Sequence, residues 1–264
     1  MQLAFAKNAA PCGSVRNLFR ILRLNNAAVI GFAALLSFSG CSTPQVIGPS
    51  SAEKQRQELA FGVGLIQRFE SEFDFRRDSA ICRYLDELAA ELTHGFQSFH
   101  DEPPRVAIIK DSDKHWHNFG FPGSRIYLSR SLLRSIQFEN ELAAAIALEL
   151  AHIDHRDLVR NYEPNKESRP WFGRDGLFEF SPEVRQSALE SAMEMMYQAG
   201  FDPRGMVRLL ERYQGIPEKA PYEEASLKAL VENSWRIIAL HAPLRNPIIR
   251  SDRFLAVYQR MQQL

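Results

Sequence analysis

Apolar residues recur every three or four positions along much of the chain, which is the spacing of amphipathic helices. The first predicted helix spans residues 52–75, with an apolar stripe of Leu59, Val63, Ile66 and Phe69. The second spans residues 78–96, with a stripe of Ile81, Leu85, Leu88 and Leu92. Further helices of this kind are predicted over residues 130–135, 181–198, 202–213, 221–240 and 250–261. The pattern predicts a mostly helical protein.

Three stretches depart from that spacing and predict strands. Residues 105–110 are a short apolar run bounded by charges. Residues 116–121 and 125–129 flank Phe121-Pro122-Gly123-Ser124, whose Pro-Gly pair is typical of the turn between paired strands. A small sheet is therefore expected beside the helices.

The helix expected over residues 139–157 is the one around which the chain is organised. Residues 142–148 are all apolar, and a helix that is apolar on nearly every side is a buried helix. Glu149 and His152 nevertheless sit within it, three residues apart and so on one face. Because an unpaired buried charge is costly, this pair needs a chemical explanation.

The pair matches part of a metal-binding motif, His-Glu-x-x-His, in which two histidines hold zinc and the glutamate acts as general base. Glu149 and His152 occupy the glutamate and second histidine positions, and Leu148 occupies the first histidine position. Leucine has no lone pair, so position 148 supplies no metal ligand.

Charge gives no nucleic-acid signal, because the chain of 264 residues holds 32 basic and 32 acidic residues. Four of the basic residues and no acidic residue lie in residues 1–40, so the remainder has 28 basic against 32 acidic residues. A mildly acidic domain of this kind has no electrostatic reason to seek DNA or anionic lipid.

The N-terminal residues read as an export signal. A basic segment is followed by an apolar run over 27–38 and by Ser39-Gly40-Cys41, which resembles a bacterial lipobox. We expect residues 1–40 to be a signal peptide, Cys41 to be lipidated, 41–51 to be a flexible tether and 52–264 to be the folded domain. Ser42 favours delivery to the outer membrane. An ordinary secretion signal or an anchor helix is the alternative.

The number and positions of the cysteines argue against a disulfide bond and against a metal site built from cysteines. Cys12 lies in the expected signal and Cys41 would carry lipid, so Cys82 is alone in the mature chain. Its helical apolar surroundings predict a core position. No intrachain disulfide and no cysteine-based metal site are expected.

Residues 161–180 lack periodicity and hold two prolines, two glycines and several aromatic residues, among them Trp171, Phe172, Phe178 and Phe180. Connections of this length inside a domain are often functional. The aromatic residues are predicted either to cover a groove or partner surface, or to pack this segment onto its own domain.

With these parts in order, the chain resembles the zinc metallopeptidases of the CAAX prenyl protease and heat-shock HtpX type, in their small soluble lipoprotein branch. The similar segments lie, in order, at 118–123, 126–133, 141–144, 199–203 and 240–243. The resemblance covers roughly residues 58–264. It implies an α+β fold: a mostly helical zincin-like (minimal gluzincin) domain with a small sheet beside the central helix, and a groove bordered by Asn118 and His241.

The resemblance also implies three zinc ligands, of which only His152 is present. The position of the third ligand, a glutamate in the family, is Ser187, and the position of an orienting aspartate is Leu189. Glu149 keeps the general-base position but would have no metal-bound water to act on. No cofactor is therefore expected, and zinc only if the chain is active.

A rebuilt metal site is the alternative. It would combine His152 with Glu190 and with His115 or His117. Glu183 and Glu190 lie about one turn either side of Ser187, and His155 lies three residues after His152. Otherwise His115, His117 and His155 are solvated, and His152 forms a hydrogen-bonded pair with Glu149.

These observations predict a catalytically inactive, lipid-anchored protein of the bacterial cell envelope, on the outer membrane and facing the periplasm, that acts as a peptide- or protein-binding or regulatory module. Its partner would be an extended peptide or an unfolded envelope protein, added as a strand along residues 116–121. The competing predictions are an active zinc metalloendopeptidase with rearranged ligands, and a purely structural envelope protein without an open groove.

Overall fold

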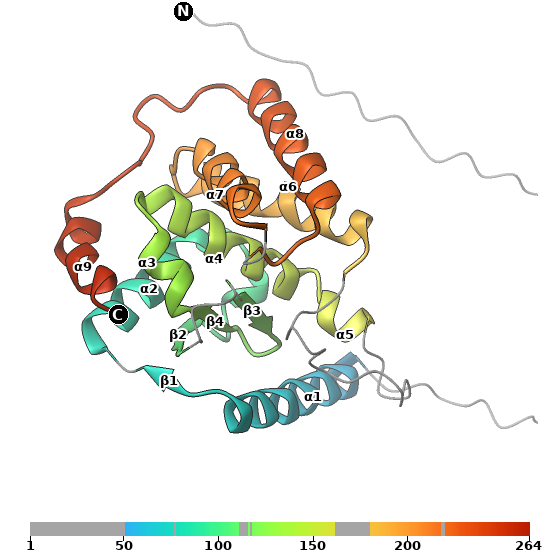
Figure 1. Cartoon of the computed structure of the whole chain (residues 1–264). Coiled ribbons are helices and arrows are strands. Elements are labelled where there is room, and N and C mark those ends of the chain that lie inside the picture. Colours follow the sequence, from blue (N-terminus) through green and yellow to red (C-terminus); the bar gives the residue numbers. More distant parts are fainter. Residues whose placement is uncertain (1–50, 77, 111–115, 117, 162–179, 218–219) are drawn as a thin grey trace, which may run out of the picture. The chain divides into compact units, whose positions relative to one another are not determined.

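The computed structural model describes residues 51–76, 78–110, 116, 118–161, 180–217 and 220–264 (Figure 1). No helix in these ranges is long and apolar enough to cross a membrane. Several residues singled out from the sequence lie outside the described part of the chain: the export signal, Cys41, His115, His117, Trp171, Phe172 and Phe178.

Among the described residues, the sheet has four short strands in the order β1-β2-β4-β3. Their bounds are β1 Phe75–Arg76, β2 Arg105–Ile109, β3 Asn118–Phe121 and β4 Arg125–Ser129. Strands β3 and β4 form the predicted antiparallel hairpin, and β2 pairs parallel to β4. The turn of the hairpin uses left-handed backbone at Gly123 and Ser124, with φ of 87° and 56°. Because β3 is last in the strand order, it lies at one edge of the sheet.

Alternation along the strands gives the sheet two apolar faces. Val106, Ile108, Ile126 and Leu128 enter the main core with the central helix, whereas Phe119, Phe121 and Tyr127 face the other way. The second face is covered by α1 (Ser51–Glu72), which lies along the sheet in Figure 1. This arrangement follows from the period of two that strand side chains have.

Phe69 is the centre of the packing between α1 and the sheet. It is fully buried, and its ring lies 4.9 Å from Phe119, 5.1 Å from Phe121 and 4.7 Å from Tyr127 between centroids. The predicted stripe of α1 was wrong at two of its four positions, because Leu59 and Val63 are exposed. Only one side of α1 packs on the sheet. The buried face of the helix is therefore narrower than the predicted stripe, and it includes Leu65.

The central helix, α4 (Glu139–Asp154), is buried at every position from Glu139 to His152, as the sequence predicted. It packs against the helices α6 (Pro182–Gln198) and α7 (Arg204–Gly215) and against β3. The remaining elements are α2 Ser79–Leu92, the short 3₁₀ helix Gln97–Phe99, α3 Arg130–Ser135, α5 Asp157–Asn161, α8 Glu224–Leu240 and α9 Asp252–Gln262. The predicted α+β fold, a small sheet beside a central buried helix, is confirmed.

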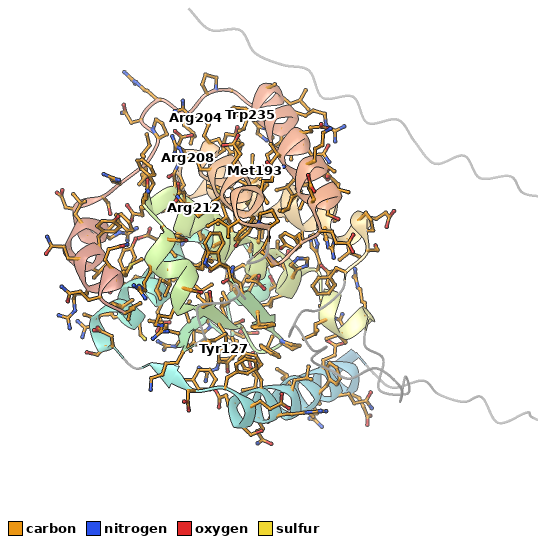
Figure 2. All side chains as sticks on the ribbon, in the orientation of Figure 1. Tyr127, Met193, Arg204, Arg208, Arg212 and Trp235 are labelled. Carbon is orange, nitrogen blue, oxygen red and sulfur yellow. The ribbon has the colours of Figure 1, made fainter. Side chains whose placement is uncertain are left out.

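The buried acidic start of α4 is paired with cations and donors from other helices. Arginines repeat every four residues along α7, at 204, 208 and 212 (Figure 2). Arg212 donates to Glu141 at 2.8 Å, and Glu139 accepts the Tyr84 hydroxyl at 2.9 Å. These pairs keep the start of α4 from carrying uncompensated buried charge.

Candidate functional site around Glu149 and His152

Glu149 and His152 line a cavity of only about 30 Å³, called here the Glu149 cavity. Leu148, in the position of the missing first histidine, lines the same cavity. The other lining residues come from four segments: Asn118, Gly120, Phe180, Tyr213, Pro221 and Tyr222. A space of this size holds about one water molecule and no polypeptide segment.

The Glu149 carboxyl is in an environment that favours its neutral form. The residue is 8% exposed, and burial raises the pKa of Glu149 to about 8, against the opposing effect of a hydrogen bond with the Gly120 backbone. Burial, and then the charge on Glu149, also raises the pKa of Tyr222, which faces the same cavity. Within the described residues no cation pairs with Glu149, so the carboxyl keeps its proton near neutral pH.

His152 is held by two contacts. Its Nδ1 lies 2.8 Å from Asp157 Oδ2, and its ring stacks on Phe180 with centroids 4.4 Å apart. Because a carboxylate accepts hydrogen bonds, Nδ1 is the donor in this contact. A carboxylate behind a histidine is also the arrangement found at metal-binding histidines. The bond to Asp157 takes the place of the predicted pair with Glu149.

Sequence reasoning missed Asp157 because it treated residues 139–157 as one helix. Helix α4 ends at Asp154, and Arg156 adopts a left-handed φ of 59°. That turn brings Asp157, the first residue of α5, back beside His152. An aspartate five residues after a histidine is not on its face of a continuous helix, so only the break in the helix could have pointed to it.

Asn118 and His241, the two residues expected at a groove, lie in different places. Asn118 lines the Glu149 cavity and donates from Nδ2 to the Tyr213 hydroxyl at 3.1 Å. His241 follows α8, with its ring stacked on Tyr197 at 4.4 Å between centroids. His241 is not among the residues that line the Glu149 cavity.

The described residues do not fit the three-ligand zinc site of the family. Ser187, at the third ligand position, is exposed on α6, and Leu189 is fully buried. Glu190 is exposed and accepts from Gln186 at 2.7 Å. A catalytic zinc needs three protein ligands. In the ranges that the structure describes, no three His, Cys, Asp or Glu side chains come together in a way that could hold a metal.

His155 contacts a serine in a way that superficially suggests nucleophilic catalysis. Its Nε2 lies 2.8 Å from Ser191 Oγ, and its Nδ1 lies 3.9 Å from Asp157 Oδ2. The second distance is too long for a hydrogen bond, and Asp157 Oδ2 already accepts from His152. A serine triad needs both bonds, so this contact does not support acyl transfer.

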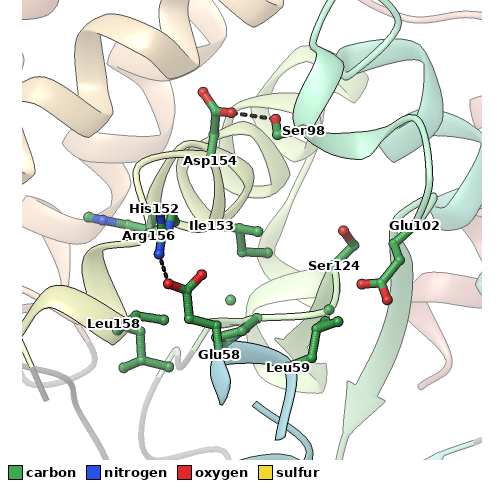
Figure 3. Close-up of a pocket in the computed structure, with 14 residues that line it drawn as sticks. Glu58, Leu59, Ser98, Glu102, Ser124, His152, Ile153, Asp154, Arg156 and Leu158 are labelled. Carbon is green, nitrogen blue, oxygen red and sulfur yellow. Dashed lines mark hydrogen bonds and ion pairs between the residues drawn. The ribbon is translucent and has the colours of Figure 1, made fainter. Parts of the chain in front are cut away.

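A second and larger hollow, called here the Pro122 hollow, has a volume of about 440 Å³ (Figure 3). It lies between α1, the β3–β4 turn, the end of α4 and α5. Gly120 and His152 line both hollows, so the two are neighbours. The remaining residues of the Pro122 hollow are Glu58, Leu59, Ser98, Glu102, Pro122, Gly123, Ser124, Ile153, Asp154, Arg156, Leu158 and Val159.

Comparison with known proteins supports the resemblance that the sequence predicted. Residues 77–168 match the family described as Peptidase family M48. The chain is 23% identical over 184 residues to the beta-barrel assembly-enhancing protease of Escherichia coli K12, an alignment that covers 59% of this chain and 37% of that protein. The protein of the same name from Yersinia pestis is 22% identical over the same shares.

A putative beta-barrel assembly-enhancing protease of Vibrio cholerae is 27% identical over 114 residues, or 43% of this chain and 23% of that protein. The alignments thus span 37% of the length of the Escherichia coli and Yersinia proteins and 23% of the Vibrio protein. Together with the family match, they confirm the predicted resemblance to this family of zinc metallopeptidases.

Proposed function

We propose that the chain is a lipid-anchored protein of the cell envelope whose metallopeptidase-like domain binds extended polypeptide without cleaving it. The observation that carries the proposal is the lining of the Glu149 cavity. Apolar Leu148 stands where a ligand is required, and Phe180, Tyr213 and Tyr222 close the remaining space. A peptide bond cannot reach Glu149 in a cavity of about 30 Å³.

The binding surface in this proposal is the Pro122 hollow and not the old catalytic centre. Within the predicted binding stretch, Trp116, Phe119 and Phe121 are buried, so their side chains offer no surface to a peptide. Pro122, Gly123 and Ser124 continue the chain from the edge strand β3 into the wall of the Pro122 hollow. A segment of polypeptide lying there would follow the sheet edge, which is a common way to bind extended chains.

The lipid anchor and the envelope location rest on Ser39-Gly40-Cys41 and the apolar run before it. Tethering at Cys41 would hold the binding domain close to a membrane. The relatives' name, beta-barrel assembly-enhancing protease, suggests envelope proteins awaiting assembly as the polypeptides concerned.

The proposal is tested with fluorescein-labelled casein, which is unfolded, and the full chain purified in detergent. We expect the anisotropy of the label to rise saturably and the casein to stay intact on gels, with or without added zinc. Cleavage that a chelator abolishes would overturn the proposal.

An active zinc peptidase with rearranged ligands is the second candidate. One observation favours it: the Asp157 carboxylate holds His152 as a metal-binding histidine is held. The further ligands would have to include residues such as His115 or His117. In the casein experiment this candidate predicts cleavage that needs zinc and fails in a His152→Ala variant.

A further inference from the structure

The walls of the Pro122 hollow are fixed by close contacts between elements far apart in the sequence. A Cβ on Gly62 of α1 would come 2.8 Å from the Pro122 carbonyl oxygen, so the helix touches the hairpin turn directly. The turn is tied to β2, because the Arg105 amide donates to the Ser124 carbonyl at 2.9 Å. The hollow is therefore part of the fold and not a gap between independent pieces.

The lining combines apolar side chains with charged ones, and the charged set is called here the rim. Leu59, Pro122, Ile153, Leu158 and Val159 supply apolar surface. Among the described residues, the rim holds three carboxylates, those of Glu58, Glu102 and Asp154, and the guanidinium of Arg156. The formal charge of the rim is therefore negative, although the chain as a whole is neutral.

Two of the three carboxylates are already engaged. Glu58 forms an ion pair with Arg156, and Asp154 accepts a hydrogen bond from Ser98 Oγ (Figure 3). Glu102 has no ion pair or hydrogen bond to any residue that the structure describes. Its carboxylate lies over the hairpin turn, where a Cβ on Gly123 would come 3.6 Å from Oε2. One anionic group at the mouth of an apolar hollow thus remains available.

We propose, on the premise of the proposed function, that the Pro122 hollow binds a lysine or arginine side chain of the bound polypeptide, with Glu102 as its main ion-pair partner. Long basic side chains bury their methylene stems against apolar surface and keep the charged end at a polar rim. An acidic side chain would be repelled by the three carboxylates. An aliphatic one would gain the apolar contact but leave Glu102 without a partner.

The size of the hollow agrees with this occupant. Pockets for small ligands enclose about 300–1,000 Å³, and the Pro122 hollow has about 440 Å³. That is room for one long side chain and part of its backbone. A metal ion is a poorer occupant, because Glu58 and Asp154 already have partners and no described group of three such side chains forms a metal site.

The test uses short extended peptides built from serine, threonine and valine, labelled with fluorescein, whose central residue is lysine, arginine, norleucine or glutamate. Binding to the full chain in detergent is followed by anisotropy. We expect the lysine and arginine peptides to bind about fivefold more tightly than the norleucine peptide, as one solvent-accessible ion pair allows. The glutamate peptide should bind most weakly, and added salt should reduce the preference.

The variant Glu102→Gln should reduce the preference for lysine to less than about twofold while leaving norleucine binding unchanged. Glu87→Gln, an exposed change on α2 away from the hollow, is the matched control and should keep the full preference. Equal binding of all four peptides would overturn this inference and leave the proposed function standing. Absence of binding by any peptide and by casein would overturn both.

Discussion

The Glu149 cavity and the Pro122 hollow share Gly120 and His152, yet they differ in size, lining and charge. The first holds about 30 Å³ behind aromatic and aliphatic side chains, and its carboxyl is buried and neutral. The second holds about 440 Å³, and its carboxylates stand at the rim. The residues around Glu149 are thus enclosed, while the hollow beside them is larger.

The two regions therefore differ in what their side chains contribute to the protein. Leu148 and Leu189 are buried, so they contribute packing where the family has polar groups. Residues of the Glu149 cavity should therefore matter for stability, whereas the rim of the Pro122 hollow should matter for binding alone.

The largest expected effect is the pH dependence that Glu149 gives to stability. The folded chain keeps the carboxyl proton up to about pH 8, whereas the ordinary pKa is 4.5. The stabilising contribution is therefore complete below pH 4.5 and is lost as the pH rises to about 8, by up to about 1.4 kcal/mol per pH unit. Urea unfolding of Glu149→Gln should show a flatter profile and higher stability than the parent at pH 8. If the free energy of unfolding depended on pH in the same way in both proteins, Glu149 could not be a buried neutral carboxyl.

A smaller loss is expected from crowding the contact between β3 and α4. A Cβ on Gly120 would lie 2.7 Å from the Glu149 carbonyl oxygen, so Gly120→Ala must push the strand from the helix. We expect it to lower the free energy of unfolding by about 2–4 kcal/mol in a denaturant titration. The control is Gly64→Ala on α1, where nothing lies within 4 Å and a gain of about 0.5–1 kcal/mol is expected. If the two substitutions changed the free energy of unfolding equally, β3 would not pack closely against α4.

The hydrogen bond behind His152 should contribute less. Asp157→Ala removes the acceptor 2.8 Å from Nδ1 and leaves a buried donor without its partner. The expected loss is about 1–3 kcal/mol by thermal or urea unfolding. Asp101→Ala, at an exposed position, should change stability by less than about 0.5 kcal/mol. If Asp157→Ala were as stable as the parent, the hydrogen bond to Asp157 would not be what holds His152 in place.

The smallest effect on stability is expected at the rim of the Pro122 hollow. Glu102 is exposed and has no ion pair within the described residues, so Glu102→Gln should change the free energy of unfolding by less than about 0.5 kcal/mol. Differential scanning fluorimetry of the two proteins checks this directly. A loss above about 1 kcal/mol would make Glu102 a structural residue.

The sequence predicted the elements well and the site only in part. Hydrophobic spacing located the hairpin, the buried helix α4 and the helix that Ser181 caps by accepting from the Val184 amide. It failed on α1, because a periodic stripe does not say how much of a helix its neighbour covers, and Leu59 and Val63 proved exposed.

The missing parts of the site depend on contacts between distant segments. Tyr213 and Tyr222 close the Glu149 cavity from residues more than sixty positions beyond Glu149. The Pro122 hollow needs α1 against the hairpin turn, and no motif records that contact. The missing ligand at position 148, by contrast, could be predicted from the sequence, because a leucine side chain cannot bind a metal.

The most direct test of this account is the zinc content of the full chain, purified without a histidine tag and dialysed against equimolar zinc, measured by elemental analysis beside a His152→Ala variant. We predict no bound zinc in either protein, because Leu148 and Ser187 supply no ligands beside His152. About one zinc per chain, lost in the variant, would contradict it and establish a rebuilt metal centre.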